Sequence, residues 1–190
     1  MQYKLTTPCT AEDLAPLKAG DTVLLSGVVY TARDQAHKRM LEALDKGEKL
    51  PFDLEGSAIY YVGPTPERPG EIIGSAGPTT SGRMDAMSPR LLDLGNKIMI
   101  GKGKRDAAVK EAVVRNGAVY LAALGGAGAL MAQSVKTLEV IAWPDLGCEA
   151  VRRLTVEDMP LTVILDAHGG DLYLSGPAAY KRQQGEGAKE

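Results

Sequence analysis

The segment Gly77–Asp85, GPTTSGRMD, holds the densest group of residues able to bind an anion. Three hydroxyl residues, Thr79, Thr80 and Ser81, lie between two glycines and are followed by Arg83. Glycines let the backbone approach a ligand closely, and consecutive N–H groups form an anion-binding nest. Thr and Ser runs also form ordinary turns. The flanking proline, glycines and arginine favour the first interpretation, a loop that grips a small carboxylate.

A second cation, Arg33, lies in the segment Thr31–Arg39, where a predicted strand passes into a helix. Its guanidinium can hold a carboxylate through two parallel hydrogen bonds, and the start of a helix adds N–H donors. Asp34 would orient Arg33 or cap the helix. The alternative is a solvated first turn with a surface arginine. His37 lies inside the helix, so we predict a structural residue there rather than a base.

A third cation, Lys102, lies between two glycines in the segment Ile100–Lys104 and follows an apolar strand. It can reach a substrate carboxylate as a point charge. The spacing does not match a Walker A loop. The alternative is a basic surface turn, which is the structure that we predict for the next residues, Lys104 and Arg105.

Other candidates are weaker. The glycine-rich Gly125–Gly128 lacks a dinucleotide-binding pattern, so it predicts tight packing of a helix against the sheet. Cys9 and Cys148 are isolated in sequence, and two cysteines are too few to hold an iron–sulfur cluster, so free thiols are the favoured interpretation. His168 precedes two glycines and indicates a turn. Cations that hold an anion are present and an electrophile is missing, which indicates an incomplete active site.

The elements that carry these residues alternate between strand and helix. This pattern predicts an α/β domain with a mixed or largely parallel sheet, whose ligands bind beyond the carboxyl ends of the strands. Helices are predicted from Thr10 towards Gly20, over Gln35–Lys46, from Ser88, over Arg105–Asn116 and within Gly125–Val135. Strands are predicted at Tyr3–Thr7, Asp21–Tyr30, Ser57–Val62, Glu71–Ser75, Lys97–Ile100, Ala118–Ala123, Glu139–Trp143 and Leu161–Asp166.

The composition narrows the class of protein. The chain has 190 residues, of which 44% are hydrophobic, and a net charge of −2. That charge gives no basic field for nucleic acid, and no apolar run is long enough to span a bilayer. The first residues lack the apolar core of a signal peptide, and the few cysteines fit a reducing compartment. We therefore expect a cytoplasmic protein that binds neither nucleic acid nor membrane.

Several segments together resemble the β subunit of class I fumarate hydratase. The same pattern is similar to the β subunit of L(+)-tartrate dehydratase and to the C-terminal half of single-chain class I fumarases. The resemblance covers Tyr3–Tyr173, which suggests one catalytic domain over residues 1–176 and a disordered tail over 177–190. It rests on Leu25–Arg39 (LSGVVYTARDQAHKR), Ile59–Pro66 (IYYVGPTP), Ile73–Asp85 (IGSAGPTTSGRMD), Ile100–Arg105 (IGKGKR) and Gly125–Leu130 (GGAGAL).

The resemblance implies a swivelling β/β/α domain with a mixed, partly parallel sheet, similar to the mobile domain of aconitase. It also implies a partner α subunit that carries a [4Fe–4S] cluster, with no metal held by this chain alone. The implied reaction is the interconversion of (S)-malate with fumarate and water by a hydro-lyase. The implied assembly is α2β2, with a homodimer of β.

The resemblance also assigns roles to residues. Arg33, Arg83 and Lys102 would hold substrate carboxylates, Thr80 would line the substrate site, and Thr79 would be the base. The catalytic acid would lie on the α subunit. A threonine hydroxyl is a weak base that needs cationic stabilisation of its alkoxide, which Arg83 and Lys102 could supply. Two alternatives stay open, an L(+)-tartrate dehydratase β subunit and a non-catalytic dicarboxylate-binding module.

Overall fold

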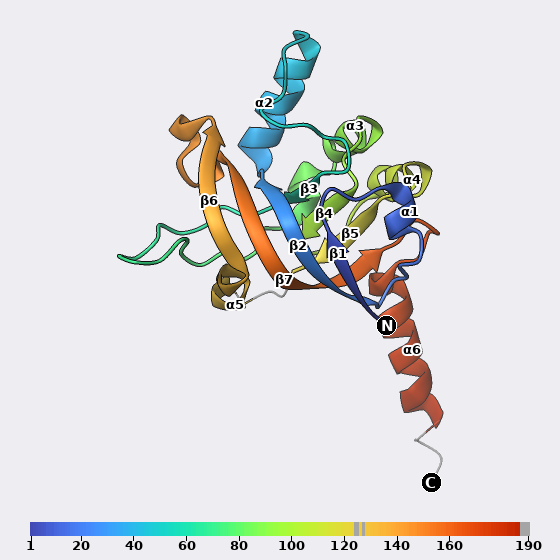
Figure 1. Ribbon diagram of the computed structural model, residues 1–190. Coiled ribbons are helices and arrows are strands. Elements are labelled where there is room, and N and C mark those ends of the chain that lie inside the picture. The colour runs from blue at the N-terminus through green and yellow to red at the C-terminus, as the bar shows by residue number, and fades with distance from the viewer. Residues whose placement is uncertain (124–125, 127, 187–190) are drawn as a thin grey trace.

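The strands join in one sheet in the order β1-β2-β3-β4-β5-β7-β6 (Figure 1). The computed structural model describes residues 1–123, 126 and 128–186. Among these residues the strands are β1 (Gln2–Thr6), β2 (Thr22–Thr31), β3 (Ala58–Tyr60), β4 (Ile98–Gly101), β5 (Val119–Ala122), β6 (Val135–Ala142) and β7 (Val151–Leu165).

The sheet is mixed, as the sequence predicts, and it closes on itself. Strands β1 to β5 pair in parallel, each with the next. Strand β7 runs antiparallel to β2, β5 and β6. Because β7 pairs with both β2 and β5, the strands β2, β3, β4, β5 and β7 form a closed ring. The carboxyl ends of β2, β3 and β4 therefore lie at the same end of this ring.

Two apolar cores lie on opposite faces of the parallel strands. Along β3, Ala58 and Tyr60 pack into the core shared with β7, whereas Ile59 packs into the core under the helices. The same alternation separates Ile98 from Met99 in β4, as expected when successive side chains of a strand point to opposite faces. The result is three layers, with antiparallel strands, parallel strands and helices in that order.

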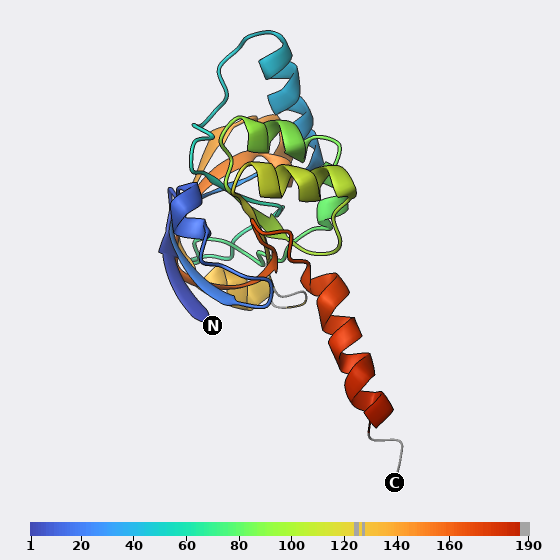
Figure 2. The same ribbon diagram turned by 90° about the vertical axis from the view of Figure 1, so that its right-hand side faces the viewer.

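Helices form in all five segments where the sequence predicts them, and a sixth helix, which the sequence does not predict, follows β7. They are α1 (Ala11–Leu14), α2 (Asp34–Asp45), α3 (Ser88–Asp93), α4 (Ala107–Arg115), α5 (Gly128–Gln133) and α6 (Leu172–Glu186), with 3-10 turns η1 (Ser81–Met84) and η2 (Pro144–Glu149). Thr10 forms a capping box with Asp13, and Pro89 lies in the first turn of α3. Figure 2 shows α3 and α4, in green and yellow-green, side by side over one face of the sheet.

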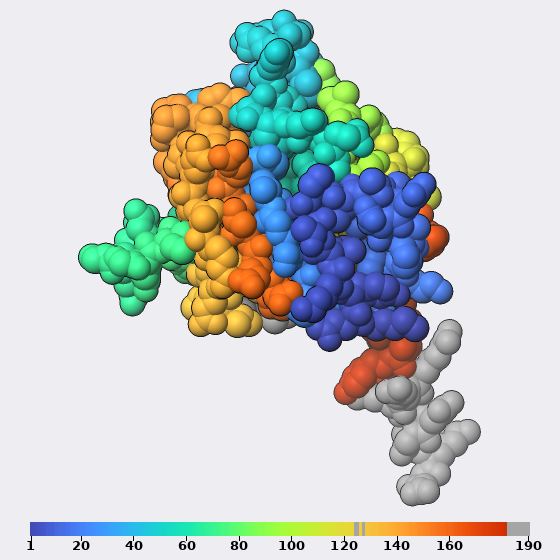
Figure 3. Space-filling view, in the orientation of Figure 1, coloured from blue at the N-terminus to red at the C-terminus, as the bar shows by residue number. Residues whose placement is uncertain are grey.

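Three predicted strands differ from the structure. Glu71–Ser75 forms no strand, because it belongs to an arm of residues 63–75 that projects from the molecule without a partner strand (Figure 3). Strand β6 begins at Val135 and β7 at Val151, both earlier than predicted. The sequence predicts only the last part of β7, which is apolar, whereas the first part carries charged residues at exposed and half-buried positions.

The C-terminal helix α6 extends away from the body of the molecule (Figure 1). It continues to Glu186, so it includes the first part of the segment 177–190 for which the sequence predicts disorder. Residues 187–190 lie outside the described residues. None of the helices in the described part of the chain is long and apolar enough to cross a membrane.

Candidate active site

The predicted carboxylate-binding loops meet beyond the carboxyl ends of β2, β3 and β4. Arg33 follows β2 by two residues and is the N-cap residue of α2. The N–H of Thr79 donates to the carbonyl of Tyr61, the residue after β3, over 2.8 Å. Lys102 directly follows β4. Parallel pairing therefore brings together residues that are far apart in sequence.

Backbone hydrogen bonds join the Thr79 loop to the Lys102 turn. Thr80 and Lys102 form a parallel β-bridge. The N–H of Ser81 donates to the carbonyl of Lys102 over 2.9 Å, and the N–H of Lys102 donates to the Ser81 hydroxyl over 3.1 Å. Thr79 is half-buried, while Thr80, Arg83 and Lys102 are exposed. The anchored backbones thus carry two threonine hydroxyls and two cations on adjoining loops.

Asp34 connects Arg33 to Arg83. Its carboxylate oxygens lie 3.8 Å from Nε of Arg33 and 3.8 Å from Nη1 of Arg83, so both guanidinium groups face the same carboxylate. Nε of Arg33 and Oδ1 of Asp34 are buried and have no hydrogen-bond partner among the described residues. Both atoms are shielded from solvent, so Arg33 and Asp34 interact by charge and not through a direct hydrogen bond.

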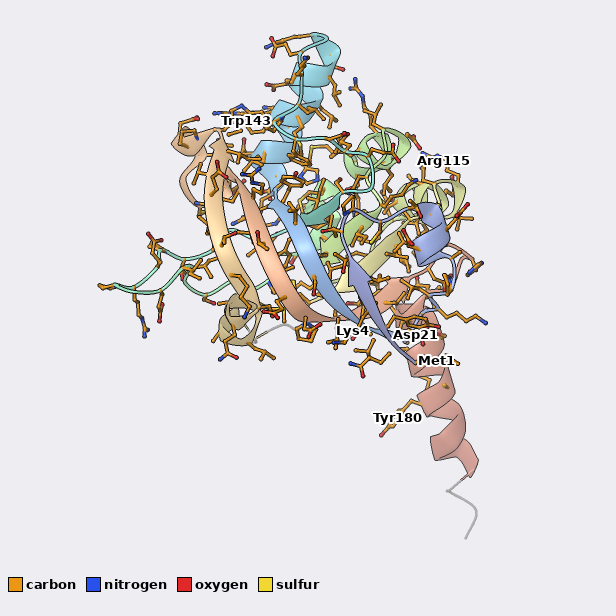
Figure 4. All side chains as sticks on the ribbon, viewed as in Figure 1. Met1, Lys4, Asp21, Arg115, Trp143 and Tyr180 are labelled. Atoms are coloured by element: carbon orange, nitrogen blue, oxygen red, sulfur yellow. The ribbon has the colours of Figure 1, made fainter. Side chains whose placement is uncertain are left out.

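Glu149 is a further contact of Arg33 that the sequence does not reveal. Its carboxylate lies 3.2 Å from Nη2 of Arg33 and accepts the backbone N–H of Gln35 over 3.0 Å. The Glu149 segment η2 is held against α2 by the ion pair between Arg39 and Asp145. Figure 4 shows the labelled Trp143, which precedes η2, near α2. No local pattern indicates Glu149, because it reaches Arg33 only through tertiary packing.

Beneath the loops, Arg105 forms a buried ion pair, which corrects its predicted place in a basic surface turn. Its side chain is 0% exposed, and Nε lies 2.5 Å from Oδ1 of Asp85. It also donates to the hydroxyl of Ser88 over 2.9 Å and lies over the rings of Tyr61 and Tyr120. Asp85 ends the predicted anion-binding segment, so this pair anchors that segment to the start of α4.

His37 is fully buried below Arg33 and fits the structural role predicted for it. Its Nδ1 lies 3.0 Å from the carbonyl oxygen of Arg33, which can only accept, so Nδ1 carries the proton. Burial lowers the pKa of His37 to about 4. The imidazole is therefore neutral near pH 7, and its Nε2 has no partner among the described residues.

Gly128, the last residue of the predicted glycine-rich segment, packs closely near the Thr79 loop. A Cβ on Gly128 would lie 2.1 Å from the hydroxyl of Ser75 and 3.1 Å from the nitrogen of Gly77. Gly128 therefore allows α5 to pack against the approach to that loop. Gly125 and Ala127 lie outside the described residues, so the predicted packing is seen only at Gly128.

The described residues contain no set of side chains suited to a metal ion. No group of three or more His, Cys, Asp or Glu residues is found among them. Cys9 is buried and Cys148 exposed, and both are free. Two hollows of about 550 and 440 Å³ flank the arm of residues 63–75, and neither is lined by any of the five predicted site residues Arg33, Thr79, Thr80, Arg83 and Lys102.

Comparison with known families decides the classification. The profile of the family described as Fumarase C-terminus matches residues 1–176. The chain belongs to this family. It is 34% identical over 177 residues to L(+)-tartrate dehydratase subunit beta of Escherichia coli strain K12, and the match covers 90% of this chain and 87% of that protein.

The chain is also similar to longer proteins that are named as fumarate hydratases. It is 39% identical over 168 residues to fumarate hydratase 2 of Leishmania major, covering 85% of this chain and 29% of the relative. It is 40% identical over 151 residues to the aerobic class I fumarate hydratase of Escherichia coli strain K12, covering 78% of this chain and 28% of the relative. The chain thus spans less than a third of the length of these hydratases.

Proposed function

We propose that the chain is the β subunit of a hydro-lyase that interconverts (S)-malate with fumarate and water. The observation that carries the proposal is the meeting of Arg33, Thr79, Arg83 and Lys102 beyond three neighbouring strands, in a chain of the Fumarase C-terminus family. The named hydratases and dehydratases among its relatives support this reaction class.

In this proposal the cations hold the two carboxylates of the substrate. Arg33 presents a planar fork that suits a carboxylate, and Arg83 and Lys102 add charge from the facing loops. Thr79 holds or accepts the proton at the substrate carbon, and the same cations stabilise its alkoxide. Asp34 and Glu149 orient Arg33 before the substrate binds.

A partner subunit completes the enzyme in this proposal. The chain covers less than a third of the fumarate hydratases it matches, and two relatives of its own size class are named as β subunits. The described residues do not fit a metal cluster, so we assign the [4Fe–4S] cluster and the catalytic acid to an α subunit. The domain would swivel against that subunit as the mobile domain of aconitase does, in a cytoplasmic α2β2 assembly.

A decisive experiment is anaerobic co-expression with the iron–sulfur partner chain of the same organism, followed by assays on fumarate, (S)-malate and L(+)-tartrate. Fast interconversion of fumarate and malate supports the proposal. Turnover of tartrate alone would make the chain the β subunit of a tartrate dehydratase, the second candidate, which the E. coli relative supports.

The isolated chain tests the non-catalytic alternative, a dicarboxylate-binding module. Such a module would bind malate tightly without a partner. In the proposed enzyme the open loops bind malate weakly until the partner covers them, because the exposed cations remain hydrated. Tight binding by the isolated chain together with no turnover by the pair would contradict the proposed function.

A further inference from the structure

A directed chain of hydroxyl hydrogen bonds lies between the Thr79 loop and the Lys102 turn. The hydroxyl oxygens of Ser81 and Tyr120 are 2.9 Å apart, and the Tyr120 hydroxyl donates to the carbonyl of Gly103 over 2.9 Å. Because a carbonyl oxygen only accepts, Tyr120 uses its proton there, and Ser81 must donate to Tyr120. The Ser81 oxygen in turn accepts the N–H of Lys102.

The direction of each bond is therefore fixed, from the Lys102 amide through Ser81 and Tyr120 to the Gly103 carbonyl. This series of hydrogen bonds thus begins and ends at adjacent residues of the turn, Lys102 and Gly103. The Gly103 N–H is held as well, since it donates to the Tyr173 hydroxyl over 3.2 Å. The turn that carries Lys102 thus has its polar backbone groups tied on both sides.

The surrounding side chains hold this series of hydrogen bonds in place. Ser81 and Tyr120 are both 0% exposed. A Cβ on Gly101 would lie 2.0 Å from the Ser81 oxygen and 2.9 Å from the Tyr61 ring, so the serine fills the space beside the glycine completely. Burial also raises the pKa of Tyr120, which keeps its hydroxyl protonated as the donor.

We propose that Ser81 and Tyr120 are positioning residues that fix Lys102 relative to Thr79 and Arg83, so that a dicarboxylate meets all three at once. The inference rests on the proposed function. Neither residue touches the substrate, because both are buried beneath the loops. They act through Lys102, whose own amide is part of the chain. Misplacement of a binding group by about 1 Å costs on the order of 100-fold in rate.

The test is a double-mutant cycle in the assembled enzyme with its iron–sulfur partner. The dissociation constant of succinate, a dicarboxylate with no double bond or hydroxyl to react, is measured by calorimetry for Ser81→Ala, Lys102→Ala and the double variant. Ser81→Ala is expected to raise the dissociation constant of succinate about tenfold when Lys102 is present. In the Lys102→Ala background the same change is expected to raise it less than about twofold. The same factor in both backgrounds would overturn the inference, since Ser81 would then not act through Lys102.

Ser57→Ala is the matched control. Ser57 is also buried, its hydroxyl accepts from Asn96 over 3.1 Å, and it lies before the opposite, amino end of β3. The Ser57→Ala variant should lower the melting temperature about as much as Ser81→Ala and leave the dissociation constant of succinate unchanged. Equal loss of binding in Ser57→Ala would make the Ser81 effect one of general stability and overturn the inference.

Tyr120→Phe, which preserves the ring, is used in a second cycle with Lys102→Ala. If Ser81→Ala does not fold, this second cycle provides the test of the inference. Turnover of fumarate by the wild-type pair is recorded in the same preparations. Absence of both turnover and succinate binding refutes the proposed function, and the inference falls with it. Turnover with additive effects in the cycle refutes the inference alone.

Discussion

Replacing Arg105 with methionine should destabilise the chain strongly. Arg105 and Asp85 are 0% and 12% exposed, so the charge of Asp85 would stay in a mostly dry site after its partner is lost. One donor would remain, the N–H of Asp106 at 2.7 Å. Removing one partner of a buried ion pair costs about 3–5 kcal/mol of the free energy of unfolding. For a chain of this size that lowers the melting temperature by about 6–20 °C.

Arg115→Met is the matched control for this variant. Arg115 ends α4 and pairs with Asp93, but the two side chains are 48% and 46% exposed. Exposed pairs contribute about 0–1 kcal/mol. Urea unfolding followed by circular dichroism measures both variants against the wild type. If Arg105→Met cost no more than Arg115→Met, the account of Arg105 and Asp85 as the anchor below the loops would be wrong.

Two further predictions concern Arg33 and His37. Arg33→Ala should raise the KM for malate about tenfold or more, because the carboxylate loses a charge-assisted fork, and an unchanged KM in steady-state assays would remove Arg33 from the site. The folded pKa of His37 is lowered from 6.5 to about 4, so its contribution to stability is complete above about pH 6.5 and is lost as the pH falls towards 4. Relative to His37→Phe, the wild type should therefore lose about 3 kcal/mol of unfolding free energy between pH 7 and pH 4. Denaturant titrations of both proteins at each pH measure this difference. Parallel pH profiles of the two proteins would contradict the prediction.

The sequence predicts those parts of the fold and site whose signals are local. The helix starts predicted at Thr10 and Ser88 and the predicted strands β4 and β5 agree with the structure because each depends on neighbouring residues. The meeting of Arg33 and Lys102 follows in the same way, since each comes directly after a strand of the parallel sheet. Thr79 does not, because the strand predicted before it is absent and its loop returns to the end of β3 through the hydrogen bond to Tyr61.

Features that depend on distant partners could not be predicted. Arg105 lies in the basic sequence Gly101–Arg105, which is typical of a surface turn, and its burial follows from Asp85, 20 residues earlier. Glu149 reaches Arg33 across more than a hundred residues. The first half of β7 is paired with β2 and β6, and its charged residues conceal that pairing in the sequence.

The most direct test of the account is the kinetic effect of Thr79→Ala in the enzyme assembled with its iron–sulfur partner. The hydroxyl is assigned to proton transfer, while Arg33, Arg83 and Lys102 are assigned to binding. We predict a fall in kcat of about 100-fold or more, the usual contribution of a general base, with KM for malate changed only a few-fold. A kcat that stays near the wild-type value would contradict the central claim that this loop takes part in the reaction.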